Sequence, residues 1–325
     1  SGVSKFDRRK REFTHYSRQN NQKNTSENEE SAVLDIYLVT DQFLLVACLD
    51  GIYELRIHSN GSYKYTEIPF LDKELFEQHK RAYKIIRYKR NAYFFATKSG
   101  ALLVDYDTKS VQEFINKPEQ YQHSILPGIC RLAYKDSKNR IFFATSSGGL
   151  SVLNDADPNN LFIQPYAGNG QLSTNLNSYF TSMTEVGPGE YYLGTGGDGV
   201  VYWNEKRNRA QIFGKKNGLP NNVVYASVLD NQNNIWLSTN KGLSRFDLKT
   251  KETFNFSEIH GLLSNEFNMG AGMHSRSGRL YFGGISGLVF FDPESLTKFN
   301  FNVEIILTKF KLDNQWLTPE DDHSP

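Results

Sequence analysis

The most restrictive feature of the sequence is a pair of short apolar runs joined by a turn that contains glycine. The clearest copy runs from Asn234 to Thr250, where residues 235–237 and the alternating run 243–246 flank Gly242. Alternation of period two places one face of a strand on a core, so this copy predicts two strands and a tight turn. Glycine suits the turn because it adopts positive φ without steric cost.

The same pattern returns along the whole chain. Its turn glycines, at spacings of 49, 49, 49, 50, 43 and 45 residues, are Gly2, Gly51, Gly100, Gly149, Gly199, Gly242 and Gly287. Each interval has room for four short strands. Radial repetition of this kind is typical of a β-propeller, whereas the rungs of solenoids are usually shorter. We therefore predict an all-β fold, a β-propeller of four-stranded blades.

The copies also predict the number of blades and the domain boundaries. Six full units follow a partial one, in which residues 2–7 match a third strand and 11–16 a fourth, so we expect seven blades and a chain cut from a longer polypeptide. Residues 17–31 are almost free of apolar side chains and are interpreted as a loop within the ring. From residue 299 the pattern changes to one alternating strand, 303–312, followed by a polar ending. We expect a propeller over 1–298 and the start of another domain over 299–325.

Composition and motif searches mostly exclude functions. Lysine and arginine number 37 against 36 aspartates and glutamates, so no global field attracts nucleic acid. The histidines form no short-spacing pair, and the 194–199 segment GTGGDG is a repeat turn rather than a dinucleotide site, which needs a following helix. Cys48 and Cys130 lie two units apart, too far to bridge, and are expected to be buried. The sequence predicts no catalytic residue, metal or cofactor.

A binding surface is expected where the connections between units enter the next inner strand. These connections are rich in glycine and asparagine, and a closed ring gathers them on one face around the central channel, where loops carry function. Amides pair with sugar hydroxyls in both directions, and aromatic rings cover the apolar side of a sugar. The alternative is that asparagine and glycine simply make turns. The candidate ligand-binding residues are Asn177, Tyr179, Asn222, Tyr225, Asn265, Phe267 and Asn268.

The clearest copy resembles the two-component regulator propeller repeat, in which an aspartate precedes a hydrophobic-Trp-hydrophobic run, a Ser-Thr or Gly-Thr step and a G-L-x-R/K-F/Y-D segment. The matching positions include Asp230, Trp236, Thr239, Gly242 and Asp247, and Asn234 stands where glycine is commoner. Residues 261–284 resemble the closing repeat of these sensors, and 303–319 the opening of the triple-tyrosine, immunoglobulin-like domain that follows.

The resemblance implies the periplasmic sensor region of a hybrid two-component system of the Bacteroides type. It implies an oligosaccharide ligand, a sister propeller and a C-terminal triple-tyrosine domain as partners, and a homodimer in the full-length receptor.

Two other functions stay open. The first alternative to a sensor is a scaffold for dimerisation or inter-propeller contact, and the second is a lyase or glycosidase. An enzyme would place catalytic carboxylates on the face of the connections, where the sequence offers only the isolated Glu185 and Glu266.

Overall fold

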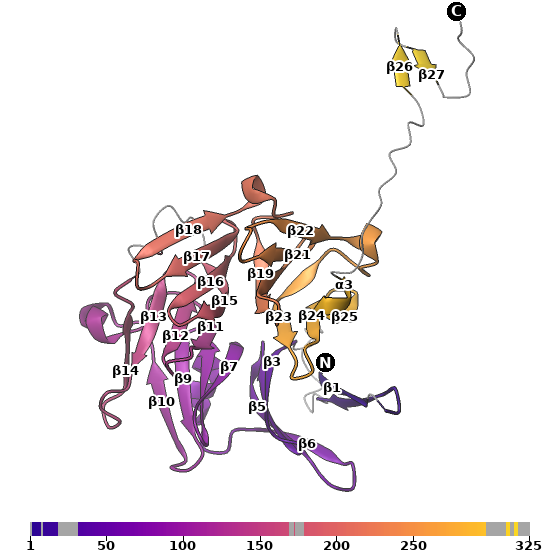
Figure 1. Ribbon diagram of the computed structural model, residues 1–325. Helices are drawn as coiled ribbons and strands as arrows, with labels where there is room; N and C mark the ends of the chain where they lie inside the picture. The colour runs from indigo at the N-terminus through magenta and orange to yellow at the C-terminus, as the bar shows by residue number, and fades with distance from the viewer. Residues whose placement is uncertain are drawn as a thin grey trace, which may run out of the picture.

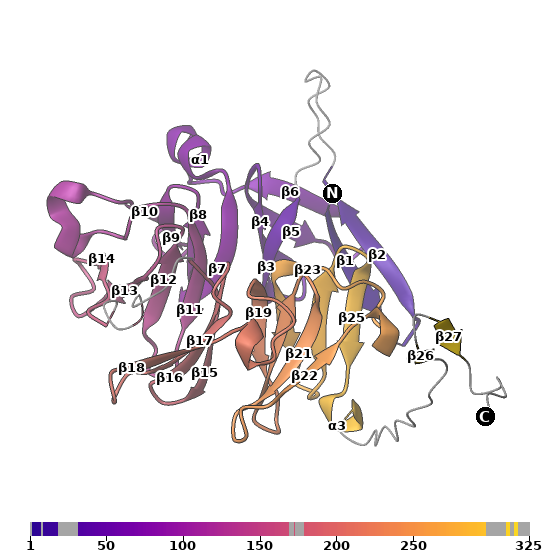
Figure 2. The same cartoon turned by 90° about the horizontal axis from the view of Figure 1, so that it is seen from above.

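The computed structural model describes residues 2–7, 9–18, 32–168, 172, 179–296, 310–312 and 315–317. Within them the repeats form sheets of antiparallel strands, each strand hydrogen-bonded to the next in the chain. Figures 1 and 2 show the sheets arranged radially around a common axis. This arrangement confirms the predicted all-β propeller with four-stranded blades.

Five sheets have four strands each. The first two are β3 (Val33–Thr40), β4 (Phe43–Cys48), β5 (Gly51–Ile57), β6 (Tyr63–Glu67) and β7 (Ala82–Lys89), β8 (Ala92–Thr97), β9 (Gly100–Asp105), β10 (Ser110–Phe114). The third and fourth are β11 (Cys130–Lys135), β12 (Ile141–Thr145), β13 (Leu150–Asn154), β14 (Phe162–Pro165) and β15 (Phe180–Gly187), β16 (Glu190–Thr195), β17 (Val200–Asn204), β18 (Arg209–Phe213).

The fifth sheet is β19 (Val224–Leu229), β20 (Asn234–Thr239), β21 (Gly242–Asp247) and β22 (Thr253–Phe256). A sixth sheet has three strands, β23 (Phe267–His274), β24 (Leu280–Gly284) and β25 (Gly287–Phe291). Helix α1 (Lys73–His79) lies between β6 and β7, and α3 (Pro293–Leu296) follows β25. Among the residues described, no helix is long and apolar enough to cross a membrane.

The repeated Thr-x-x-Gly step closes the turn between the second and third strands of a blade. Gly242 has φ of +100°, and a Cβ at this position would lie 2.0 Å from the carbonyl oxygen of Phe256 on the fourth strand. The hydroxyl of Thr239 donates to the carbonyl oxygen of Gly242 at 2.9 Å. The glycine is therefore required both by the backbone conformation and by the close approach of the neighbouring strand.

The core lies between neighbouring sheets, and Trp236 shows how the sequence builds it. Its ring is fully buried, with its centroid 4.7 Å from that of Phe291 in the next sheet. Its indole Nε1–H donates to Oδ2 of Asp230 at 2.8 Å, and Oδ1 of Asp230 accepts the backbone amides of Gln232 and Asn234 at 2.8 Å each. The aspartate of the repeat thus fixes the turn and satisfies the buried tryptophan.

The prediction of seven blades is wrong, because the described residues form six. The opening segment forms a two-stranded sheet, β1 (Gly2–Asp7) and β2 (Glu12–Ser17), which packs Val3 and Tyr16 against the first four-stranded sheet. A blade needs an inner strand that lines the channel, and this hairpin supplies none. The face of β3 beyond the hairpin remains open, with Ile36 47% and Leu38 59% exposed.

The C-terminal segment is described only in part. Strands β26 (Phe310–Leu312) and β27 (Gln315–Leu317) pair in antiparallel fashion. The predicted strand 303–312 has its first seven residues outside the described part of the chain, as does most of the expected domain 299–325.

Candidate functional site

Each inner strand carries an irregularity at the end where the connection enters it. In β11, Cys130 pairs with Thr145 and Leu132 with Ala144, so that Arg131 has no partner in the ladder. The same register shift occurs at the start of β3, β7, β15 and β19, and a larger one covers residues 268–271 of β23. In each inner strand one residue is the first to lie outside the register of the ladder. We call these six residues together the mouth ring: Leu34, Tyr83, Arg131, Thr181, Tyr225 and Asn268.

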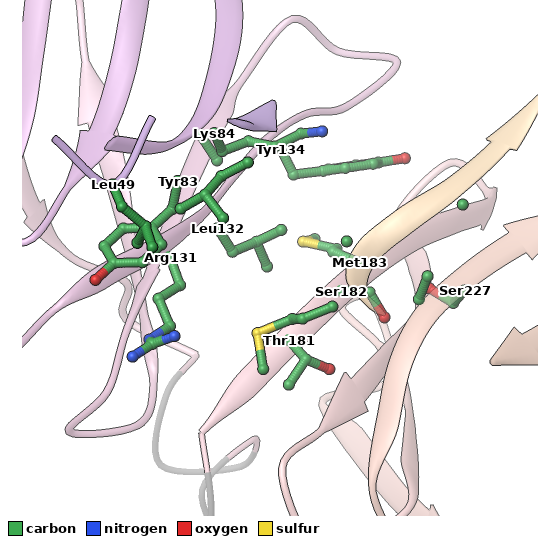
Figure 3. Close-up of a pocket in the computed structure, with 16 residues that line it drawn as sticks. Leu49, Tyr83, Lys84, Arg131, Leu132, Tyr134, Thr181, Ser182, Met183 and Ser227 are labelled. Carbon is green, nitrogen blue, oxygen red and sulfur yellow. The ribbon is translucent and has the colours of Figure 1, made fainter. Parts of the chain in front are cut away.

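A bulge re-aims the side chain of the residue that it adds. Four members of the mouth ring line a cavity of about 350 Å³ in the central channel: Leu34, Tyr83, Arg131 and Thr181. All six inner strands contribute to its walls, and Figure 3 shows side chains converging from β7, β11, β15 and β19. The volume lies within the range of about 300–1,000 Å³ that is usual for small-molecule sites. The propeller therefore offers a concave site on its axis.

Aromatic rings and hydroxyl groups face this cavity. Tyr83 and Tyr134 line one side of it, and Thr181, Ser182 and Ser227 line another. The Thr181 hydroxyl donates to a backbone carbonyl of β19, and the Ser227 hydroxyl lies 2.8 Å from that of a threonine on β15. The buried Oγ of Ser182 has no hydrogen-bond partner among the described residues.

The charged residues that line the cavity are both cationic. The guanidinium carbon of Arg131 lies 4.8 Å from the ring centroid of Tyr83 on the neighbouring strand. Lys84 is engaged elsewhere, because its Nζ lies 3.2 Å from Oδ1 of Asp35. The lining residues include no aspartate, glutamate or histidine.

Three of the residues predicted from the sequence, Tyr179, Tyr225 and Asn268, lie at the entry end of the inner strands. Tyr225 and Asn268 belong to the mouth ring. The ring of Tyr179 lies over Gly196, because a Cβ added to Gly196 would be 3.1 Å from Cε1 of Tyr179. Burial raises the pKa of Tyr225, and the nearby charges of Glu266 and Tyr179 raise it further. The structure thus brings Tyr179, Tyr225 and Glu266 together at the edge of the channel.

The other predicted residues have different surroundings. Oδ1 of Asn222 accepts the backbone amide of Lys215 at 2.8 Å, and Oδ1 of Asn265 accepts that of Glu258 at 3.0 Å, so both asparagines fasten the turn before an inner strand. Phe267 is 3% exposed and packs in the core between the last two sheets. Asn177 lies outside the described residues.

Sequence reasoning missed Leu34, Tyr83, Arg131 and Thr181. The signal that identifies them is positional. In five of the six units the mouth-ring residue directly follows a buried first residue of the inner strand, as Arg131 follows Cys130 and Tyr225 follows Val224, and in β3 it follows the partly buried Val33. The identity of the residue varies between units while its position does not.

Other polar clusters hold neighbouring blades together. Arg140 donates from Nη1 to Oε1 of Glu205 at 2.6 Å and from Nε to Oδ2 of the buried Asp136 at 2.8 Å. Hydrogen bonding from Arg140 to Glu205 is the main reason that the pKa of Glu205 falls to about 2. Glu185 accepts from both the amide and the hydroxyl of Ser137. Within the described ranges, no three histidine, cysteine, aspartate or glutamate side chains are placed to hold a metal ion.

The chain is similar to sensor proteins of two-component systems. Residues 218–241 match the family model described as "Two component regulator propeller". A histidine kinase, P4, from Formosa agariphila is 29% identical over 219 residues, which are 67% of this chain and 16% of that protein.

Two solved structures share the fold. The extracellular domain of a putative hybrid two component system from B. thetaiotaomicron superimposes with a TM-score of 0.60 at 21% identity, over 84% of this chain and 40% of that one. A virginiamycin B lyase from Staphylococcus aureus gives a TM-score of 0.56 at 11% identity, over 81% of this chain and 85% of the lyase. The chain thus spans less than half of its sensor relatives and most of the lyase.

Proposed function

We propose that the chain is a two component regulator propeller that acts as a non-enzymatic sensor module and binds an oligosaccharide at the mouth of its channel; the match of residues 218–241 to that family model supports the first part. The observation that carries the proposal is the mouth ring. Each of the six inner strands leaves its ladder at the end where the connections gather, and four of the six mouth-ring residues line a cavity on the axis.

The proposed site combines the two kinds of group that sugars require. Tyr83, Tyr179 and Tyr225 supply aromatic faces for the apolar side of a sugar ring, and Thr181 and Asn268 supply polar atoms for its hydroxyls. Among the described residues no carboxylate or histidine lines the cavity, so this part of the chain does not supply there the groups that a lyase or glycosidase uses for proton transfer.

The signal would pass to segments beyond the propeller. Helix α3 follows β25 at the end of the blades opposite the mouth ring (Figure 2). We assign residues 1–298 to the propeller and 299–325 to a linker and the first strand of a triple-tyrosine domain, on the extracytoplasmic side of a membrane. Ligand binding shifts the population of paired protomers, with the sister propeller and the triple-tyrosine domain as intramolecular partners.

A thermal-shift screen against plant, host and microbial oligosaccharides tests the proposal, followed by calorimetry on each hit. A ligand that binds only the native state raises the melting temperature as its concentration increases. The double variant Tyr225→Ala, Asn268→Ala should weaken a hit about tenfold or more. The matched control is Asn159→Ala, because Asn159 is an exposed residue in the turn before β14, at the other end of the blades.

Either of two results would contradict the proposal. A flat panel from a well-folded sample would move the ligand site out of this propeller. A hit that binds the double variant as tightly as the wild type would place the site elsewhere on it.

A second candidate function is protein contact, and the open apolar faces favour it. Ile36 and Leu38 on β3 are about half exposed, as are Leu288 and Phe290 on β25. Such faces are usually covered in assemblies. Light scattering that shows a stable dimer, disrupted by Leu38→Asp, together with no response to any sugar, would favour a scaffold over a sensor.

A further inference from the structure

Arg131 has an unusual position in the mouth ring. Its backbone lies outside the register of β11 and β12, and such a bulge re-aims the side chain of the added residue. Its guanidinium packs on the Tyr83 ring at 4.8 Å, and no carboxylate lies within ion-pair distance among the described residues. A guanidinium held on an aromatic ring keeps its outward N–H groups available and pre-oriented.

The surroundings of Arg131 leave its charge uncompensated within the cavity. The other lining cation, Lys84, is paired with Asp35, and none of the described residues that line the walls is acidic. Glu266 is exposed at the edge of the channel beside Tyr225, and it does not line the cavity. The Oγ of Ser182, on β15, is buried at the wall without a partner in the described structure. The cavity therefore presents an excess positive charge.

We propose that the ligand of the channel cavity is an anionic saccharide, whose carboxylate or sulfate group binds Arg131 while its sugar ring lies against Tyr83. This inference rests on the proposed function and specifies the ligand class of the same site. The planar guanidinium presents two parallel N–H groups that match the paired oxygens of either anion. A neutral sugar would leave this cation desolvated without a partner, which disfavours its binding.

The dimensions of the cavity support recognition of a terminal sugar. About 350 Å³ is small for an oligosaccharide chain but suits an end unit that enters from the mouth. The hydroxyls of Thr181 and Ser182 lie across the cavity from Arg131 on the next inner strand (Figure 3). A charged end group would thus reach Arg131 while the remaining units extend over the connections.

The experiment compares matched sugars on the wild type and two variants. Calorimetry uses galacturonic acid oligomers of two to four units, the corresponding galactose oligomers, and the sulfated disaccharide of chondroitin. Arg131→Gln removes the charge and keeps much of the length. Arg209→Gln removes a charge from an exposed position on the outermost strand β18 and serves as the matched control. Melting temperatures without ligand verify that both variants fold.

We expect an acidic sugar to bind the wild type and the Arg209→Gln variant, with affinity that falls as salt is added. Loss of a charge-assisted hydrogen bond should weaken binding by Arg131→Gln about ten- to a hundred-fold. Preference for the uronate or for the sulfate identifies the anionic group.

Three outcomes would overturn the inference and leave the sensor proposal standing. The first is tighter binding of the neutral galactose series, and the second is unchanged affinity of Arg131→Gln for the acidic sugar. The third is a folded wild type that binds none of the acidic sugars. The sensor proposal fails separately, when the wider oligosaccharide panel is flat.

Discussion

Replacing Asp230 by alanine should destabilise the propeller strongly. The carboxylate is 4% exposed and accepts four hydrogen bonds, from the amides of Gln232 and Asn234 at 2.8 Å, from Asn234 Nδ2 at 3.0 Å and from Trp236 Nε1 at 2.8 Å. Asn234 and Trp236 are themselves buried, so water cannot replace the lost acceptor without entering the blade. The alanine variant leaves these donors unsatisfied.

The cost follows from the number of donors left behind. A buried donor without a partner costs about 1–3 kcal/mol, so losing the acceptor for the Trp236 indole and the Asn234 groups should cost about 3–5 kcal/mol. Asp230→Asn keeps one acceptor oxygen for the backbone amides but turns an NH₂ group toward the indole. We expect about 1–3 kcal/mol for this variant.

Urea unfolding followed by tryptophan fluorescence measures both values, with the midpoint shifting at constant slope. Asp247→Ala is the control, because Asp247 accepts the amides of Lys249 and Thr250 at 2.7 and 2.9 Å in a turn open to solvent. It should cost about 0.5–1.5 kcal/mol. A loss below about 1 kcal/mol for Asp230→Ala, or one equal to that of the control, would refute the reasoning.

Two further predictions concern the backbone and pH. Gly242→Ala should destabilise the fold by more than about 3 kcal/mol, because it combines the penalty of a left-handed backbone with a clash against the Phe256 carbonyl oxygen. Gly61→Ala, at φ of +85° with open space around it, should cost about 1–2 kcal/mol. Equal losses of stability in urea unfolding would contradict this reasoning. Arg140 lowers the pKa of Glu205 from 4.5 to about 2, so the carboxylate stabilises the fold above about pH 4.5 and this contribution is lost as the pH falls toward 2. Glu205→Gln should therefore cost about 1–2 kcal/mol at pH 7 after solvent screening, and a difference from wild type that stays constant down to pH 2 would exclude this role.

The sequence predicts the blades well because the repeat encodes local interactions. The step from Thr239 to Gly242 and the pair Asp230 and Trp236 act within one blade, so their spacing alone indicates their contacts. The number of blades depends instead on which strands line the channel. The first hairpin matches the repeat in sequence, yet it contributes no inner strand, and the repeat count therefore overestimates the ring.

The site was predicted only partly, because its geometry depends on bulges. In a regular strand, alternate residues point to opposite faces of the sheet, so the sequence predicts the face of each residue. A one-residue bulge reverses this prediction for the residues beyond it, and no particular residue type in the sequence indicates where the bulge lies. Tyr225 and Asn268 were predicted because they follow polar connections. Arg131 was missed because it lies between Cys130 and Leu132 in a run that predicts an ordinary strand. Asn222 and Asn265 fit the simpler explanation of turn formation.

The bulges also determine how readily this surface can diverge. The mouth-ring residues lie outside the ladder, so exchanging one of them leaves the ladder hydrogen bonds of its blade intact. Thr181 is a more costly position, because its buried hydroxyl donates to a backbone carbonyl of the next inner strand. Positions on blades that do not touch contribute nearly additively, whereas neighbours such as Tyr83 and Arg131 are coupled by contact. Gene duplication of a blade copies the scaffold together with one free position. In a family of such rings, single substitutions at these positions can therefore change the ligand at little cost in the free energy of unfolding.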